Sequence, residues 1–314
     1  MSNITASIEQ RMTGASLILL SSSIGLILNL LLLVVFIKNY KTFKQTPFFL
    51  FAINIIIGDL MVILAQLIVA VPIIYAGQQV YGSTLPKIIS LGDAIGYTLN
   101  LYFAIVLVIN RLFQFCSVTL RKLCFGRSGT ALIIFFVWTI ILTRTIGSVV
   151  FGCVKDFDAI NYNFYFDCNR PEASAFAKWS VQIVKQESFF EPIAMLAVYL
   201  FIAVWIRVKY HIGMTKSLST HEKRLLIQSF LICGMLFLEA IAFAFVRKLS
   251  PEGSAAYYIA FAVNLIIVLN ASMHAIILFI FNHDIRMKIR AMFHRYPSSQ
   301  VMHLTHIRHR SSTR

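Results

Sequence analysis

The sequence predicts an all-α integral membrane protein: a seven-transmembrane helix bundle followed by a short amphipathic eighth helix. Of its 314 residues, 58% are hydrophobic and only 13% are charged, which is too apolar for a surface that faces water. An α-helix needs roughly 20 apolar residues to cross the bilayer core, and seven stretches qualify. They are Ser16–Ile37, Pro47–Tyr75, Lys87–Phe115, Gly129–Phe151, Glu187–Tyr210, Lys223–Val246 and Ala256–Phe281.

These stretches divide the chain into an outer N-terminal segment (1–15), the membrane bundle (16–281), the amphipathic helix (282–295) and a tail (296–314). The first stretch has a Leu-rich core and follows a polar leader of about 15 residues. No small-residue cleavage site precedes this stretch. We therefore interpret this stretch as a retained signal anchor.

Polar residues weaken the apolar signal of the third and fifth stretches. The third contains Asp93, Asn100 and Asn110, and the fifth contains Glu187 and Glu191 near its start. Such residues are costly in hydrocarbon, so they should face the interior of the bundle.

One face of the third stretch carries a polar stripe. Asp93 and Arg111 are 18 residues apart, which is five full helical turns and places them on the same face. Tyr97, Asn100 and Ala104 continue the stripe between them. Lipid would penalise this face, so the third helix is predicted to be central.

A polar core is predicted at mid-depth. It is formed by residues of four helices, namely Asn29, Asp59, Asn100, Asn270 and His274. They could surround water or a sodium ion near Asp59, or they could simply form hydrogen bonds between helices. We expect no other cofactor and no metal site.

The amphipathic segment and the longest loop follow from local composition. Ile285, Ile289 and Met292 share one helical face with Phe293, as suits a helix at the membrane interface. The loop 152–186 is rich in aromatic and acidic residues and could cover a pocket.

The distribution of Lys and Arg predicts the orientation. Of the 28 such residues, 19 fall in segments that are cytoplasmic if the N-terminus is outside, and 8 fall in outer segments, as the positive-inside rule requires. A plasma-membrane location follows, with anionic lipid rather than nucleic acid as the partner of the +15 net charge. Asn3 is then a glycosylation site, and Cys153 and Cys168 share an oxidising loop where they can form a disulfide.

Several short motifs carry a resemblance to a known superfamily. They are Gly25 with Asn29, Ile57-Gly58-Asp59-Leu60, Ile109-Asn110-Arg111-Leu112, Trp138, Pro192, Ile227-Gln228-Ser229-Phe230, His274-Ala275 and Phe281-Asn282-His283-Asp284-Ile285-Arg286. Together they resemble the rhodopsin-like G-protein-coupled receptors, and particularly the nematode serpentine chemoreceptors of class X. The resemblance covers nearly the whole chain from the first helix to the amphipathic helix.

The chain also departs from the general superfamily pattern. Pro86 stands where the third helix usually begins with a disulfide cysteine, so the loop must close on itself. Leu238-Glu239-Ala240-Ile241-Ala242 replaces the Cys-Trp-x-Pro kink, and His274-Ala275-Ile276-Ile277-Leu278 replaces Asn-Pro-x-x-Tyr.

The resemblance implies a chemosensory receptor that binds an extracellular small molecule or peptide and activates a heterotrimeric G protein. Asn110 and Arg111 would form the G-protein switch, and Glu222 would hold Arg111 at rest. Asp93 stands where amine receptors place the counter-ion of the ligand.

With Asp93, the candidate ligand residues are Tyr97, Glu239 and Tyr257. Asp93 could instead neutralise Arg144 or Lys87, because buried charges usually pair.

Two other functions are compatible with seven helices. A transporter also needs carboxylates in the membrane, but the chain shows no internal repeat. A scaffold without signalling is the second. We do not expect an enzyme, because no catalytic constellation is apparent.

Overall fold

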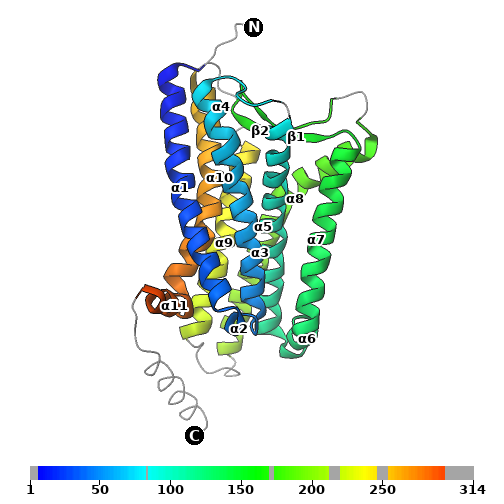
Figure 1. The fold of residues 1–314 in the computed structure, drawn as a ribbon. Helices are drawn as coiled ribbons and strands as arrows, with labels where there is room; N and C mark the ends of the chain where they lie inside the picture. The colour runs from blue at the N-terminus through cyan, green and yellow to red at the C-terminus, as the bar shows by residue number, and fades with distance from the viewer. Residues whose placement is uncertain (1–5, 83, 170–172, 212–219, 246–253, 294–314) are drawn as a thin grey trace.

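The computed structural model describes residues 6–82, 84–169, 173–211, 220–245 and 254–293 and forms an elongated bundle of long helices (Figure 1). Seven spans within these residues are long and apolar enough to cross a membrane, as the sequence predicts. They are α1 (Ile8–Lys38), the continuous run α3 (Pro47–Ala65), η1 (Gln66–Ala70) and α4 (Val71–Ala76), then α5 (Thr84–Cys116), α7 (Arg127–Val150), α8 (Ala175–His211), α9 (Thr220–Phe245) and α10 (Ser254–Phe281). The chain is a multi-pass membrane protein.

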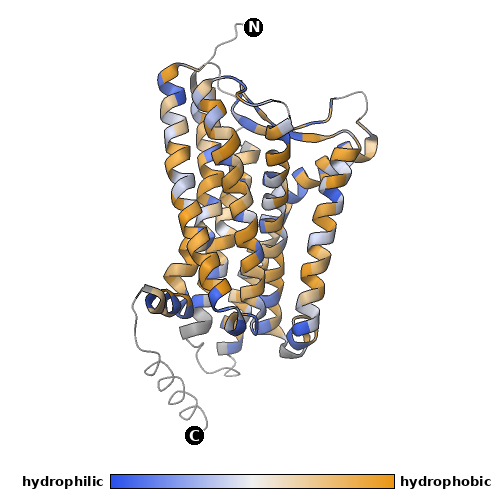
Figure 2. Cartoon of the chain, in the orientation of Figure 1, coloured by the Kyte–Doolittle hydropathy of each residue, from blue (hydrophilic) through white to orange (hydrophobic). Residues whose placement is uncertain are grey.

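Burial along the bundle matches a lipid solvent. Large apolar side chains such as Leu20, Phe135 and Leu200 are more than 60% exposed, and apolar residues cover the sides of the bundle in Figure 2. Polar side chains such as Asp59 and Asn29 are instead fully buried inside it. This arrangement is favourable only where the outer surface faces hydrocarbon.

Helix α1 begins at Ile8, eight residues before the predicted start of the first stretch at Ser16. A capping box explains the earlier start. The Ser7 hydroxyl accepts a hydrogen bond from the Gln10 amide at 3.2 Å, and the Gln10 side chain accepts one from the Ser7 amide at 3.0 Å. These bonds satisfy amide groups that a helix N-terminus otherwise leaves unpaired.

The second span contains one π-helical turn, η1, before Pro72. Proline lacks an amide hydrogen and displaces the carbonyl one turn earlier, so the wider turn absorbs the misfit. Gln66 lies in this turn, and its amide donates to Asn264 Oδ1 of α10 at 3.2 Å. The apolar pattern did not predict this irregularity.

Helix α5 is central, as the polar stripe predicts, because it contacts α3, α7, α8 and α9. Its closest neighbour is α3, through Gly58 and Gly96. A Cβ atom at Gly96 would lie 2.4 Å from the Gly58 carbonyl oxygen, and one at Gly58 would lie 2.7 Å from that of Gly96. The two backbones therefore pack directly against each other.

The long loop folds into an antiparallel hairpin of β1 (Val154–Asp158) and β2 (Asn163–Asp167), which lies over one end of the bundle, hereafter the hairpin end (Figure 1). The predicted disulfide between Cys153 and Cys168 is confirmed and joins the bases of the two strands.

Helix α8 begins 12 residues before the predicted Glu187. Ala177 and Val181 of these added turns pack against Cys153, so the end of the loop is helical.

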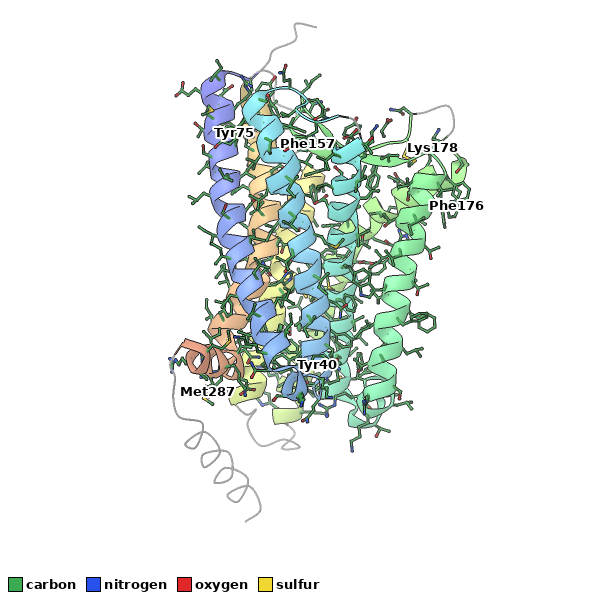
Figure 3. All side chains as sticks on the ribbon, in the orientation of Figure 1. Tyr40, Tyr75, Phe157, Phe176, Lys178 and Met287 are labelled. Atoms are coloured by element: carbon green, nitrogen blue, oxygen red, sulfur yellow. A yellow bond between two sulfur atoms is a disulfide. The ribbon has the colours of Figure 1, made fainter. Side chains whose placement is uncertain are left out.

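The opposite end, hereafter the basic end, carries the short helices α2 (Tyr40–Phe43), α6 (Val118–Cys124) and α11 (His283–Phe293). Figure 2 shows hydrophilic residues on all three. In Figure 3, Tyr40 and Met287 mark this end, whereas Tyr75 and Phe157 mark the hairpin end. Ile285 of α11 is fully buried and Met287 is half exposed, which gives this helix the two-faced character that the sequence predicts.

Candidate functional site

The hairpin is held in place by its tight turn. Asp158 Oδ1 accepts hydrogen bonds from the amides of Ile160 and Asn161 at 2.7 and 3.1 Å. Tyr162 closes the turn with φ +49°, a conformation that costs energy for a residue with a side chain. Asn264 of α10 donates to the Tyr162 carbonyl at 2.6 Å.

The Tyr162 ring stacks on Phe261 with centroids 5.5 Å apart, and burial raises the pKa of its phenol. The hairpin turn is therefore anchored on α10.

Under the hairpin lies a cavity of about 90 Å³, hereafter the central cavity. Residues of α5, α9, α10 and the hairpin line it, namely Asp93, Tyr97, Lys155, Asn163, Phe164, Glu239, Phe243, Val263, Asn264 and Ile267. Three of the four candidate ligand residues predicted from the sequence thus meet at one cavity.

The fourth, Tyr257, lies elsewhere: its ring packs 5.7 Å from that of Tyr162 in the apolar cluster beside the turn.

Asp93 forms its ion pair with Lys155 of β1. The expectation that Arg144 or Lys87 would neutralise it was wrong, because the folded hairpin brings Lys155 over α5. Arg144 of α7 instead pairs with Glu187 of α8, with Nη1 2.8 Å from Oε2, and also donates to the Tyr102 hydroxyl. In both pairs a charge is balanced by an opposite charge on a different element.

The predicted polar core separates into three hydrogen-bonded groups. Asp59 accepts from Asn100 at 2.7 Å and contacts His274 Nδ1 at 2.8 Å, which joins α3, α5 and α10. Asn270 donates to Glu239 of α9. Asn29 donates to the carbonyls of Gly25 and Ala271, both at 3.0 Å.

The sodium ion near Asp59 stays a prediction. Both carboxylate oxygens of Asp59 contact His274 Nδ1, and Oδ1 also accepts from Asn100. These contacts form a hydrogen-bonded connection between α3, α5 and α10, and Asn100 Oδ1 beside them has no hydrogen-bond partner among the described residues.

At the basic end, Arg111 is 3% exposed. Its Nη1 donates to Gln114 Oε1 at 2.7 Å, and its guanidinium lies over the Phe48 ring, 5.0 Å from the centroid. Nε and Nη2 have no partner among the described residues. Asn110 beside it is also buried.

The side chain of Glu222, the proposed partner of Arg111, lies outside the described residues. Asn3, the proposed glycosylation site, also lies outside them.

Two residues that line the central cavity, Lys155 and Asn264, were not predicted as site residues from the sequence. Lys155 lies two residues after Cys153, on strand β1, and the pairing of β1 with β2 places it over the bundle. Its position therefore follows from the strand pairing and is not visible in the sequence pattern. Asn264 is one of few polar residues in a very apolar stretch, and that isolation was a usable signal for an interior position.

The fold matches that of a known receptor structure. The crystal structure of squid rhodopsin superposes with a TM-score of 0.75 at 17% sequence identity, over 93% of this chain and 89% of that chain. This likeness shows the rhodopsin fold. No curated protein matches the sequence.

The sequence itself matches one protein family. The profile of the serpentine type seven-transmembrane G-protein-coupled chemoreceptors Srx aligns with residues 19–282. That span includes the central cavity, the disulfide-closed hairpin and Arg111. The chain therefore belongs to the Srx family of serpentine seven-transmembrane G-protein-coupled chemoreceptors.

Proposed function

We propose that this protein is a chemosensory receptor that binds a small molecule in the central cavity and in response activates a heterotrimeric G protein at the basic end. The observation that carries the proposal is the arrangement of helix α5. Asp93 faces a cavity under the hairpin, and Arg111 is buried five turns away at the other end of the same helix. A shift of α5 would therefore change the contacts of Asp93 at the central cavity and those of Arg111 at the basic end.

The composition of the central cavity limits the ligand. It contains two carboxylates, Asp93 and Glu239, and one ammonium group, Lys155. Lys155 pairs with Asp93, whereas the described hydrogen-bond partner of Glu239 is the neutral amide of Asn270. The excess of carboxylate favours a ligand that donates hydrogen bonds or carries a positive charge.

Arg111 is suited to a switch because its contacts are incomplete. Two of its nitrogen atoms are buried without a partner among the described residues, and such groups are costly to leave unpaired. The tip of a G protein that enters the basic end would offer acceptors to them. In the resting state, Glu222 would hold Arg111 by a salt bridge.

The remaining partners follow from orientation. With the N-terminus and hairpin outside the plasma membrane, the exposed cations Lys38, Lys41, Lys44 and Lys122 face the cytoplasm. Anionic inner-leaflet lipid would then be their partner. Asn3 would be glycosylated on the outer side.

The test is G-protein activation measured in cells at matched surface expression, basal and across a panel of small molecules. We expect Arg111→Ala to abolish the response and Glu222→Ala to raise the basal signal. Lys122→Ala, which removes an exposed cation of α6 at the same end, is the matched control and should signal normally.

A response that survives Arg111→Ala would contradict the proposed switch. Basal signalling unchanged by Glu222→Ala would contradict the salt bridge alone. If no variant and no compound gives a signal, a transporter or a scaffold becomes the better account.

A further inference from the structure

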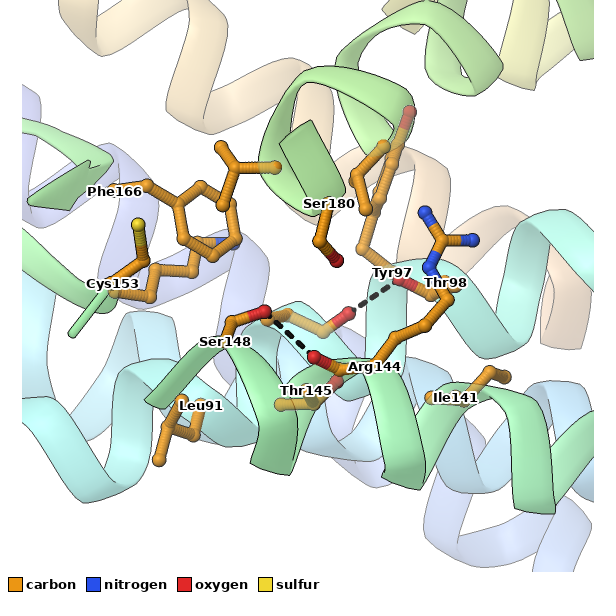
Figure 4. Close-up of a pocket in the computed structure, with 14 residues that line it drawn as sticks. Leu91, Tyr97, Thr98, Ile141, Arg144, Thr145, Ser148, Cys153, Phe166 and Ser180 are labelled. Carbon is orange, nitrogen blue, oxygen red and sulfur yellow. Dashed lines mark hydrogen bonds between the residues drawn. The ribbon is translucent and has the colours of Figure 1, made fainter. Parts of the chain in front are cut away.

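A second cavity of about 70 Å³, hereafter the side cavity, lies between α5, α7 and α8 beside the hairpin (Figure 4). Leu91 of α5, Ile141 of α7, Val181 of α8 and Phe166 of β2 give it mainly apolar walls. It is separate from the central cavity. The two cavities share Tyr97 and Lys155 as lining residues. The other residues that line the side cavity have no role in the proposed binding of ligand or G protein.

Arg144 lines the side cavity and has one nitrogen atom that donates no hydrogen bond within the described residues. Its Nη1 donates to the Tyr102 hydroxyl and to both Glu187 oxygens. Its Nη2 is buried and has no partner among the described residues. A guanidinium group carries five N–H donors in a fixed plane, so an acceptor placed at Nη2 would gain a hydrogen bond without disturbing the pair with Glu187.

The charges around Arg144 decide what kind of acceptor fits. Glu187 already balances Arg144 at 2.8 Å, and the carboxylate of Glu191 lies near enough to interact electrostatically with both. An anionic ligand would face two carboxylates, and a cationic ligand would face Arg144 and Lys155. A neutral group meets neither penalty.

Two hydroxyl groups complete the site. Thr145 of α7 and Ser180 of α8 both line the cavity and present hydroxyl groups that can donate or accept a hydrogen bond. Thr98 and Ser148 instead donate to the carbonyls of Ala94 and Arg144. A few polar groups among apolar walls is the usual composition of a small-molecule site.

We propose that the side cavity binds a small, mostly apolar, neutral molecule whose ketone or ester carbonyl accepts a hydrogen bond from Arg144. The same chemistry exists in a free small molecule and in the ester of a membrane lipid. A cavity of about 70 Å³ has no room for the acyl chains of a membrane lipid, so the proposal commits to the free molecule. It does not depend on G-protein coupling.

The experiment uses the full-length protein purified in dodecyl maltoside, which contains no carbonyl group. The thermal unfolding midpoint is followed by tryptophan fluorescence with four probes of one chain length: 2-hexanone, hexanoate, hexylamine and hexane. A fifth probe, dihexanoyl phosphatidylcholine, represents a lipid ester. We expect 2-hexanone alone to raise the midpoint, by about 3 °C at ten times its Kd.

Three variants connect the shift to the side cavity. Arg144→Lys keeps a cation for Glu187 but removes the second nitrogen, so the response to 2-hexanone should fall at least tenfold in apparent Kd. Ala94→Leu and Val184→Phe fill the cavity from α5 and α8 and should each abolish the response. Leu142→Val, at an exposed position of α7, is the control and should respond as the wild type does.

Four results would overturn the proposal. One is an equal shift by all four hexyl probes, and another is no shift by any of them. The third is a shift by 2-hexanone that persists in both Ala94→Leu and Val184→Phe. These two variants keep the test decisive if Arg144→Lys fails to fold. The fourth is a shift by the phosphatidylcholine alone, which would make the occupant a lipid. Because no G protein is present, these results are independent of whether the receptor signals.

Discussion

Single buried polar residues connect the helices of this receptor where apolar packing alone would leave their relative positions free. Asp59 is completely buried, and its contacts with Asn100 and His274 join three helices. A separate hydrogen bond, from Trp138 of α7 to Asn54 of α3 at 2.8 Å, connects a fourth helix to α3. Each partner satisfies a group that would be expensive to bury alone.

We predict that Asp59 and His274 are energetically coupled. Either Asp59→Asn or His274→Leu alone should lower the free energy of unfolding by about 1–3 kcal/mol, because each change weakens or removes a hydrogen bond to a buried polar group. The double variant should cost less than the sum of the two, by about 0.5–3 kcal/mol.

The measurement for this pair is thermal or denaturant unfolding of the four proteins in detergent. Thr139→Val, at an exposed hydroxyl of α7, serves as the control and should be nearly neutral. Strict additivity of the two single changes would contradict the coupling.

At the scale of elements, α3 and α5 approach so closely because each offers a glycine to the other. The Gly96 position has no room for a Cβ, since the Gly58 carbonyl oxygen would lie 2.4 Å away. Gly92, one turn earlier on the same helix, has only Met61 Cε nearby, at 4.0 Å. The two glycines therefore have different roles within one helix.

We predict that Gly96→Ala destabilises the protein by about 1–3 kcal/mol, because the added methyl group forces the helices apart. Gly92→Ala should be neutral or stabilise by up to about 1 kcal/mol, because alanine has the higher helix propensity and meets no clash. Unfolding midpoints of the two variants in the same detergent provide the comparison. Equal effects at the two positions would argue against direct backbone packing.

The hairpin depends on its covalent closure as well as on its contacts with α10. The bond between Cys153 and Cys168 closes a loop with a sequence separation of 15, and loops of about this length gain about 3 kcal/mol from closure. Cys153→Ser with Cys168→Ser should cost about that much stability and weaken ligand binding in the central cavity, because Lys155 lies on β1.

Unfolding with and without a reducing agent checks the role of the disulfide. The wild type should be sensitive to reduction, whereas the double serine variant should not be. Cys124→Ser removes a free cysteine of α6 and is the control. A wild-type midpoint that does not change on reduction would show that the bond contributes nothing.

For the whole molecule, the charge distribution determines how the bundle sits in a membrane. Exposed lysine residues lie at the basic end, on α1, α2 and α6 and in the turn after α2, and acidic residues such as Asp156 and Asp158 lie on the hairpin. Positive residues in short loops are retained on the cytoplasmic side during insertion. The basic end should therefore face the cytoplasm.

We predict that an antibody tag at the N-terminus is stained on intact cells, whereas a tag at the C-terminus is stained only after permeabilisation. Single cysteines at Lys178 or Lys122 refine the test, because both positions are exposed and they lie at opposite ends. The background lacks the free cysteines Cys116, Cys124 and Cys233 and keeps the disulfide. A membrane-impermeant thiol reagent should label the first and not the second. The reverse pattern would overturn the orientation.

The sequence by itself determined the seven spans, the central place of α5, the amphipathic α11 and the disulfide, because these depend on composition, helical period and compartment. It also selected Asp93, Tyr97 and Glu239, since polar residues in apolar spans are confined to the interior. It placed the start of α8 too late, because the early turns of this helix pack on the disulfide rather than on lipid and so are less apolar.

Only the tertiary structure decided which polar groups are partners. Lys155 rather than Arg144 pairs with Asp93, because strand pairing of the hairpin carries it over α5, and Arg144 reaches Glu187 on a helix distant in sequence. Burial is a property of one residue and its helix face, so the sequence reveals it. Pairing is a property of two elements and the angle between them, which side-chain packing sets after the chain has folded.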